Sequence, residues 1–173
     1  GLMETVVREA KAYASTRKSW GKTLDKHELM AEMIADMEMD LMALRSMGLR
    51  AAYHRSLENL GAQFVKNCPQ QDRQGVFKKL AVHEHEVRSL TPLIKYYTGE
   101  RAFTMARSGY QILGGYGFTK EYKAEWLLRE SLIYSVYEGT SQMQALMCLK
   151  DTMKHVIKYP KTFVQNFLAD SYR

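Results

Sequence analysis

Apolar residues recur along the chain at helical spacing, and strand-like alternation is almost absent. Five of them step by four, three, four and three positions, and two more widen the same helical face. The five are Met30, Ile34, Met37, Leu41 and Leu44, with Leu29 and Met33 beside them. This stripe predicts a long helix from about Asp25 to Leu60, of a length typical of helical bundles.

Glycine, proline and polar clusters divide the rest of the chain into further helices. In the first half of the chain, we predict a helix over Leu2–Ser19, a break near Gly21, Thr23 or Asp25 as the N-cap of the long helix, and a polar loop over 67–75. A helix over Val76–Leu113 follows, disturbed near Thr91–Pro92 and Gly99, and it ends in a sharp loop at 114–117. The rest is predicted as a helix over Glu121–Leu132, a turn at 137–140, and a last long helix from Thr140 that Pro160 separates from a short helix. The pattern predicts an all-α fold, an up-down four-helix bundle with additional short helices, as one domain over residues 1–173.

Composition fits a globular domain and shows no targeting or membrane signal. The chain has 173 residues, of which 46% are hydrophobic and 25% charged. It has no apolar run of about 18 residues, so we expect no membrane span. The first residues, GLMETVVREAKAYASTRKSW, lack the apolar stretch of a signal peptide, so we expect a protein that is not secreted. They look like the middle of a helix, and we expect the chain to be a fragment.

The charge, cysteine and methionine content limit which ligands and which cellular compartment we expect for this protein. The net charge is +6, but the basic residues are scattered, which favours a solvated face or an anionic ligand such as a nucleotide or CoA phosphate. No nucleic-acid-binding motif is present, so we expect no nucleic-acid partner. Cys68 and Cys148 lie 80 residues apart, typical of two reduced thiols in a reducing compartment. The eleven methionines are typical of adaptable core packing, with a Met-lined ligand surface as the alternative.

Two short motifs suggest sites, each with a structural alternative. His83-Glu84-His85-Glu86 lacks the HExxH spacing, and helical residues two apart point to different faces, so we interpret it as a solvated face without a metal. The GGYG sequence at 114–117 is not GxGxxG and follows no strand, which excludes a dinucleotide-binding βαβ unit. Its paired glycines either stop a helix or allow a bulky ligand to approach the backbone.

A single carboxylate ends the apolar run IYSVYEGTSQ. Glu138 is followed by Gly139 and by Thr140-Ser141, either of which can cap a new helix. Backbone N–H groups at a helix start attract anions and oxyanions. An acid at this place is therefore either a partner of the helix dipole or a proton acceptor beside a site that stabilises negative charge.

Several segments together resemble the acyl-CoA dehydrogenase family. QILGGYGFTKEY, LLRES and IYSVYEGTSQMQ are similar to the family's C-terminal signature, and AKAYASTRKSWGKTLDKHELMAEMIADM is similar to its YxxxRxxFG pattern with the LADM-like end. The spacing agrees as well, because Arg17 lies 20 residues before Met37 and Lys95 lies 16 before Gln111. The resemblance covers roughly residues 1–60 and 93–150. It implies the C-terminal helical bundle of a parent protein whose N-terminal helical domain and middle β-domain are not part of this chain.

The resemblance implies oxidation of an acyl-CoA thioester to its trans-2-enoyl-CoA with FAD as cofactor. Glu138 matches the base that removes the α-proton, and its backbone N–H matches a donor to the thioester oxygen, worth about 3–4 kcal/mol of barrier lowering. Gly139 leaves the substrate α-carbon unobstructed beside the base, and Tyr137 would line the acyl pocket. Burial would raise the pKa of the base and the helix start would oppose that rise.

Other matched residues belong to the cofactor site. Arg17 matches an arginine that meets the flavin diphosphate from a neighbouring subunit, and Trp20 stands at an aromatic position near it. The other matched cofactor positions are Glu28, Gln111, Gly114, Gly115, Thr140 and Gln142. Glu28 departs from the usual glutamine and would weaken contact with a diphosphate unless Arg17 or Lys26 neutralises it. Arg129 matches a structural arginine, and Glu130 replaces an aspartate.

The resemblance also implies partners and leaves two rival functions. It implies a homodimer or homotetramer, an electron-transfer flavoprotein as electron acceptor, and a bacterial cytoplasmic or mitochondrial matrix location. The rivals are an acyl-CoA oxidase, which passes electrons to oxygen, and a helical oligomerisation module without chemistry. The 173-residue chain alone is expected to fold and self-associate but to be inactive.

Overall fold

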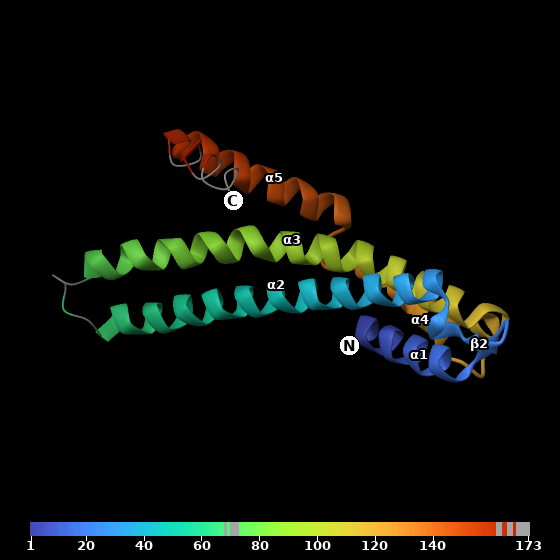
Figure 1. The fold of residues 1–173 in the computed structure, drawn as a ribbon. Coiled ribbons are helices and arrows are strands. Elements are labelled where there is room, and N and C mark those ends of the chain that lie inside the picture. The colour runs from blue at the N-terminus through green and yellow to red at the C-terminus, as the bar shows by residue number, and fades with distance from the viewer. Residues whose placement is uncertain (68, 70–72, 162–163, 166–167, 169–173) are drawn as a thin grey trace. The chain divides into compact units, whose positions relative to one another are not determined.

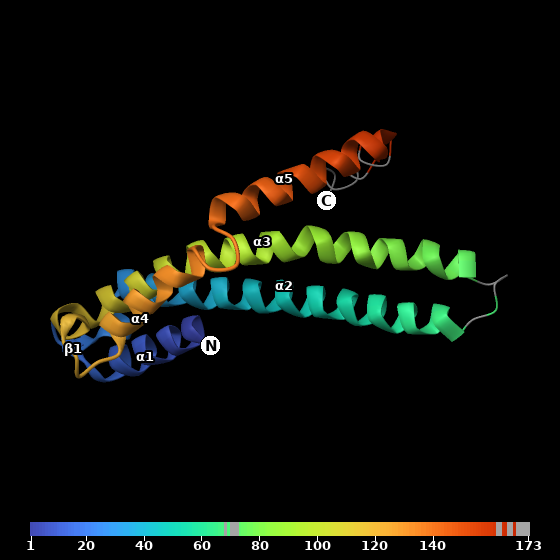
Figure 2. The same ribbon diagram turned by 180° about the vertical axis from the view of Figure 1, so that it is seen from behind.

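The computed structural model describes the chain except residues 68, 70–72, 162–163, 166–167 and 169–173, and the side chain of residue 155. Its helices are α1 (Leu2–Thr16), α2 (Glu28–Asn67), α3 (Arg73–Leu113), α4 (Ala124–Ser131) and α5 (Ser141–Lys158), with a two-residue pair of strands, β1 (Lys18–Ser19) and β2 (Lys22–Thr23). Short 3₁₀ turns cover Leu24–Lys26, Gly114–Phe118 and Leu132–Ser135. The predicted all-α fold is confirmed (Figures 1 and 2).

The chain forms two compact units. The first unit contains residues 1–49 and 94–141, and the second contains residues 50–93 and 142–173. Helices α2 and α3 contribute to both, and they lie side by side in antiparallel directions in both views. All candidate site residues except Gln142 belong to the first unit.

The core of the first unit is built by four helices. Its buried residues come from α1, α2, α3 and α4, and are Val6, Val7, Ala10, Ala14, Ile34, Met37, Met105, Ala106, Ile112, Leu113, Ala124 and Leu127. Met37 and Met105 are the deepest large side chains, at 2% and 1% exposure, and each burial contributes about 1.5–3 kcal/mol. The predicted stripe on α2 is confirmed except for Leu29, which is exposed. Methionine therefore fills the core at these two positions.

A charged network joins α2 to α3 inside the same unit. Asp40 of α2 is buried and accepts hydrogen bonds from the Tyr97 hydroxyl at 2.9 Å and from Arg101 Nε at 2.7 Å. The bond to Asp40 is the largest cause that raises the pKa of Tyr97, with burial second, because the neutral phenol is the donor. An ion pair that is also hydrogen-bonded to a tyrosine fixes one register between the two helices.

The second unit repeats this antiparallel pairing with different chemistry. Arg50 Nη2 of α2 lies 2.7 Å from Glu86 Oε2 of α3, and the Nδ1 atoms of His54 and His83 are 2.9 Å apart. Arg88 of α3 reaches Asp151 of α5 at 3.4 Å. The HEHE motif thus contributes His83 and Glu86 to helix packing. Within the described residues, no group of three or more histidine, cysteine or acidic side chains could hold a metal ion.

Several predicted boundaries are wrong by a few residues. The first helix ends at Thr16 rather than Ser19, because the chain turns back at Trp20-Gly21. The long helix begins at Glu28 rather than Asp25 and extends to Asn67, so neither Thr23 nor Asp25 is its N-cap. The helix predicted over Glu121–Leu132 covers Ala124–Ser131 and continues as a 3₁₀ turn.

The third helix starts earlier than predicted and is not interrupted. It begins at Arg73 and continues through Pro92 to Leu113. Proline removes one backbone hydrogen bond and usually bends a helix. Here Pro92 is buried, and the preceding Thr91 hydroxyl donates to the Val87 carbonyl at 2.7 Å. Packing on this segment outweighs the local cost, which the sequence pattern alone does not indicate.

The remaining segments agree with the prediction where they are described. Residues 136–139 form a turn and α5 begins at Ser141. The predicted loop over 67–75 is shorter, because residues 73–75 are helical, and residues 68 and 70–72 lie outside the described part of the chain. The Cys68 thiol also lies outside it, and Cys148 is a half-buried free thiol. No described helix is long and apolar enough to cross a membrane.

Candidate functional site

Arg17 stands at the corner between α1 and the β1–β2 hairpin. Its backbone is extended, and its carbonyl accepts from the Leu24 N–H at 2.9 Å, which closes the hairpin behind it. The side chain is exposed, and its guanidinium lies 5.6 Å from the centroid of the Tyr116 ring, a cation–π contact. The hairpin therefore directs a fixed positive charge toward the GGYG turn.

One pocket collects four of the predicted cofactor residues. Arg17, Gln111, Gly114 and Gly115 line a cavity of about 560 Å³ together with Tyr13 and Tyr116. Gly114 has φ +57°, and a Cβ built on either glycine meets no atom within 4 Å. The pocket offers a guanidinium, an amide and two unobstructed peptide groups. This donor set fits a diphosphate and its attached sugar.

Trp20 and Glu28 line a neighbouring pocket of about 680 Å³ with Lys22 and His27. Trp20 is 95% exposed, so its indole rests on no core residue. The Lys26 ammonium, one of the two cations that could neutralise Glu28, pairs with Asp25 at 3.4 Å. Glu28 thus places an exposed carboxylate beside the Arg17 pocket.

The Glu138 turn has a strained backbone. Glu138 has φ +51° and Gly139 has φ +96°, two consecutive residues in the left-handed region. A glycine adopts such a φ at little cost, which explains Gly139, whereas glutamate pays about 1–2 kcal/mol. The Glu138 side chain is exposed, and α5 begins three residues later. Strain of this kind in a non-glycine residue is typical of functional turns.

Neighbouring residues surround this turn with aromatic and polar groups. Tyr137 is exposed and packs edge-on against Tyr134 at a centroid distance of 5.8 Å. Thr140 is half-buried and occupies the position before α5, while Gln142 is exposed in its first turn. The Ser141 hydroxyl is buried and makes no hydrogen bond within the described residues, so it does not cap α5. Thr140 therefore remains the predicted cap.

Apart from Gln142, the predicted residues form two groups within the first unit. The Glu138 turn lies against α3 at Lys95, whose Nζ donates to the Tyr134 carbonyl at 2.6 Å. Gln111 lies 16 residues further along the same helix, about 24 Å at 1.5 Å per residue. In the sequence, Lys95 stands out only by its spacing to Gln111, and Gly99 shows no sign of belonging to the site. Lys95 and Gly99 are four residues apart and therefore lie on one face of the helix, which is the sequence signal that could have linked these two residues.

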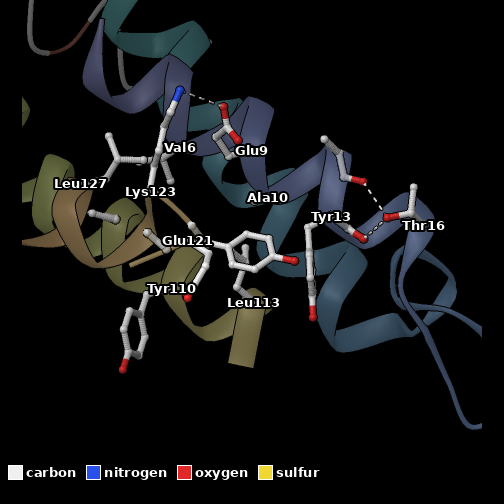
Figure 3. Close-up of a pocket in the computed structure, with 15 residues that line it drawn as sticks. Val6, Glu9, Ala10, Tyr13, Thr16, Tyr110, Leu113, Glu121, Lys123 and Leu127 are labelled. Atoms are coloured by element: carbon white, nitrogen blue, oxygen red, sulfur yellow. Dashed lines mark hydrogen bonds and ion pairs between the residues drawn. The ribbon is translucent and has the colours of Figure 1, made fainter. Parts of the chain in front are cut away.

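A third cavity contains none of the predicted site residues. It has a volume of about 300 Å³, lies between α1, α3 and α4, and is lined by apolar and aromatic side chains (Figure 3). Burial raises the pKa of Tyr13 at its wall. Lys123 closes one side by an ion pair with Glu9 at 4.0 Å. Its lining also includes Glu121, but neither this acid nor Glu9 lies in a positive-φ turn like that of Glu138.

The architecture defines an all-α protein with an exposed acid before a helix start and a separate pocket lined by Arg17 and Gln111. The profile of the family described as "Acyl-CoA dehydrogenase, C-terminal domain" matches residues 1–68 and 74–153. The chain belongs to the acyl-CoA dehydrogenase family, as the resemblance of its motifs predicts.

Similar proteins carry related names. The chain is 29% identical over 147 residues to a short-chain-specific acyl-CoA dehydrogenase of Clostridium acetobutylicum, covering 85% of this chain and 32% of that protein. It is 31% identical over 147 residues to the subunit CarC of the caffeyl-CoA reductase–Etf complex of Acetobacterium woodii, with the same coverage. Among solved structures, ACDH-11 of Caenorhabditis elegans in complex with C11-CoA superposes with a TM-score of 0.71 at 25% identity, covering 87% of this chain and 23% of that one. The chain thus spans about a third of the length of the curated relatives it matches.

Proposed function

We propose that the protein containing this chain is an FAD-dependent acyl-CoA dehydrogenase in which Glu138 is the base. The observation that carries the proposal is the exposed carboxylate of Glu138 in a left-handed turn three residues before α5. Glu138 takes the α-proton of an acyl-CoA, and its own N–H donates to the thioester oxygen as the enolate develops. Flavin, when bound, accepts the β-hydrogen as hydride.

The Arg17 pocket supports the cofactor part of the proposal. Members of the family are FAD-dependent flavoproteins. Arg17, Gln111 and the peptides of Gly114 and Gly115 would hold the adenosine-diphosphate part, with Trp20 and Glu28 at the side of the pocket. Thr140 and Gln142 would contact the flavin after the catalytic turn, and Tyr137 and Gly139 would border the acyl group. Lys22 lines the same pocket as Glu28 and would offset part of that negative charge.

The separation of the two groups supports an oligomer. About 24 Å of α3 lies between Lys95, beside the Glu138 turn, and Gln111, beside Arg17. A second copy of the chain would bring its Arg17 pocket to the cofactor site that Glu138 of the first copy would border. We therefore propose a homodimer or homotetramer in which each cofactor site uses two chains. The 173-residue chain by itself would lack turnover, because it spans only a third of its relatives.

The proposed electron acceptor and cellular location follow from the proposed acyl-CoA dehydrogenase activity. An electron-transfer flavoprotein is the proposed acceptor, and one relative is a subunit of an Etf complex. A bacterial cytoplasmic or mitochondrial matrix location fits the free thiol of Cys148. Rapid peroxide formation on reoxidation of the reduced full-length protein would instead favour the acyl-CoA oxidase.

Replacement of the base tests the proposal directly. Glu138→Gln in the full-length protein keeps the size of the side chain and removes the proton acceptor. We expect desaturation to fall by about 10²–10⁴-fold at unchanged flavin content. Glu130→Gln, an acid on the nearby α4, is the matched control and should keep its rate. Desaturation by Glu138→Gln at the wild-type rate, or a wild-type protein without flavin, would contradict the proposal and favour a helical association module.

A further inference from the structure

Helix α3 contacts the Glu138 turn through the side chain of Lys95. Its ammonium donates a hydrogen bond to the Tyr134 carbonyl at 2.6 Å and lies 4.6 Å from the centroid of the Tyr137 ring. Tyr134 lies four residues before Glu138, and Tyr137 lies immediately before it. One half-buried cation thus holds both ends of the segment that leads into the acid.

Gly99, one helical turn beyond Lys95, allows the turn to approach the helix closely. A Cβ built on Gly99 would lie 3.0 Å from the Tyr134 carbonyl oxygen, 3.2 Å from Ser135 Cα and 3.3 Å from Ser141 Oγ. Such distances are shorter than ordinary van der Waals contacts, and two of the three atoms belong to the backbone. Helix α3 therefore touches the chain both before and after Glu138.

The Glu138 turn depends on this contact because it has little regular structure of its own. Glu138 and Gly139 both have positive φ, and a 3₁₀ turn rather than a strand precedes them. Two short-range bonds lead into the turn, from the Val136 and Tyr137 N–H groups to the Ile133 carbonyl at 3.0 and 3.1 Å. A non-glycine residue persists in this conformation when surrounding contacts determine it.

The segment of α3 that makes the contact is itself anchored. Tyr97 and Arg101 alternate with Lys95 and Gly99 along the helix, and both bind the buried Asp40 of α2. The position of Lys95 is thus set by the helix pair and not by the turn that it holds.

We infer that Lys95 and Gly99 are positioning residues for the Glu138 carboxylate. Lys95 supplies the bond that fixes the turn, and Gly99 supplies the space that lets the turn reach the helix. This inference rests on the proposed function for its catalytic meaning. Neither residue touches the reacting atoms, and each acts through the backbone of residues 134–141. A base displaced by even 1 Å loses much of its rate advantage.

The structural half of the inference is tested on the 173-residue chain by amide hydrogen exchange. Lys95→Met keeps the apolar stem and removes the ammonium, and Lys95→Arg keeps a cation. We expect the Val136 and Tyr137 amides to exchange at least about 10-fold faster in Lys95→Met, with slow exchange recovered in Lys95→Arg. The exposed Lys79 on the same helix gives the matched control, Lys79→Met, which should exchange like the wild type. The Leu24 amide, bound to the Arg17 carbonyl, is the internal reference for an intact first unit.

Two results of this measurement would overturn the inference. Equal exchange of Val136 and Tyr137 in Lys95→Met and wild type would show that the ammonium does not hold the turn. Equally fast exchange in Lys95→Arg and Lys95→Met would show that the cation is not the determinant. Gly99→Ala, which keeps Lys95, is the second variant and should accelerate the same amides.

The catalytic half is tested in the full-length flavin-loaded protein with an acyl-CoA that the wild type desaturates. We expect Lys95→Met to lower kcat per bound flavin by at least about 10-fold, with KM within about twofold. The isotope effect of an α-deuterated substrate should rise, because α-proton removal becomes slower; a loss of folded protein would leave it unchanged. Wild-type kcat and isotope effect in Lys95→Met would overturn the positioning role alone. A wild type without desaturation, or an active Glu138→Gln, would overturn the proposed function instead.

Discussion

Two turns in the first unit share one backbone conformation but are held in different ways. Trp20-Gly21 and Glu138-Gly139 are each a non-glycine residue followed by glycine, with φ values of +50° and +81° in the first turn and +51° and +96° in the second. The first turn joins β1 to β2, where Ser19 pairs with Lys22 and Lys18 with Thr23. Two-residue hairpin loops with two positive φ values match the twist of the strands they join.

The hairpin turn is held by residues close in sequence. The Leu24 N–H donates to the Arg17 carbonyl at 2.9 Å, and His27 Nε2 donates to the Ser19 carbonyl at 2.9 Å. The Glu138 turn is held by Lys95 and Gly99, about 40 residues away in the sequence. A hairpin closes itself, whereas the acid depends on a helix that is fixed independently. Because of this difference, the Glu138 turn can be exposed to solvent while its backbone keeps one conformation.

The largest expected effect on stability is the difference between alanine substitution at Gly99, where neighbouring atoms leave no room for a Cβ, and at Gly48, where there is room. Gly99→Ala places a Cβ against the Tyr134 carbonyl and should destabilise the chain by about 1–3 kcal/mol. Gly48→Ala, in the interior of α2 where an added Cβ meets no atom within 4 Å, should stabilise it by about 0.5–1 kcal/mol. Urea unfolding of both variants measures the difference. Stabilisation by Gly99→Ala would show that the turn does not rest against α3.

Replacing the glycine of either turn should destabilise the chain to a similar extent, but the two replacements should differ in their effect on activity. Gly21→Ala and Gly139→Ala each force alanine into a left-handed conformation, with an expected loss of about 1–2 kcal/mol. Only Gly139→Ala should lower kcat in the full-length protein, because only that glycine adjoins the proposed base. Urea midpoints and steady-state kinetics of the pair measure this. Equal kcat values in the two variants would contradict the assignment of the second turn to catalysis.

A smaller effect is expected from relief of strain at the non-glycine positions. Asparagine adopts positive φ more readily than tryptophan or glutamate, so Trp20→Asn and Glu138→Asn should each stabilise the chain by about 0.5 kcal/mol. In the full-length protein, Glu138→Asn should abolish desaturation as well. Thermal unfolding measures the first effect. A clear loss of stability in Glu138→Asn would show that its side chain supports the fold.

The smallest expected effect is the loss, at high pH, of the hydrogen bond from Tyr97 of α3 to Asp40 of α2. The hydrogen bond to Asp40, followed by burial, raises the pKa of Tyr97, so its stabilisation is full below the unfolded tyrosine pKa of about 10 and is lost as pH rises through the higher folded value. Exchange at Val136 and Tyr137 should therefore accelerate at alkaline pH more than exchange in the hairpin, after correction for intrinsic rates. Tyr97→Phe should remove this pH-dependent excess. An identical excess in Tyr97→Phe would exclude Tyr97 as its source.

The local pattern predicted the elements better than their ends. Helical spacing of Ile34, Met37 and Leu44 placed the stripe of α2 correctly, because burial on one face is a periodic requirement. The end of α1 was wrong by three residues and the start of α2 by three, since a two-residue hairpin at Trp20-Gly21 leaves almost no pattern in the sequence. The disturbance predicted near Pro92 does not interrupt the helix, since α3 continues from Arg73 to Leu113.

For the candidate site, the sequence by itself determined the family, through the order of its motifs, and the position of the proposed base, Glu138, before a glycine and a helix start. Tertiary structure decided which distant groups meet. It placed Arg17 and Gln111 around one pocket and Lys95 and Gly99 against the Glu138 turn. The physical reason is that periodicity and turn preference act over a few residues. The contact of an ammonium with a carbonyl 39 residues away depends on how two separately formed elements pack.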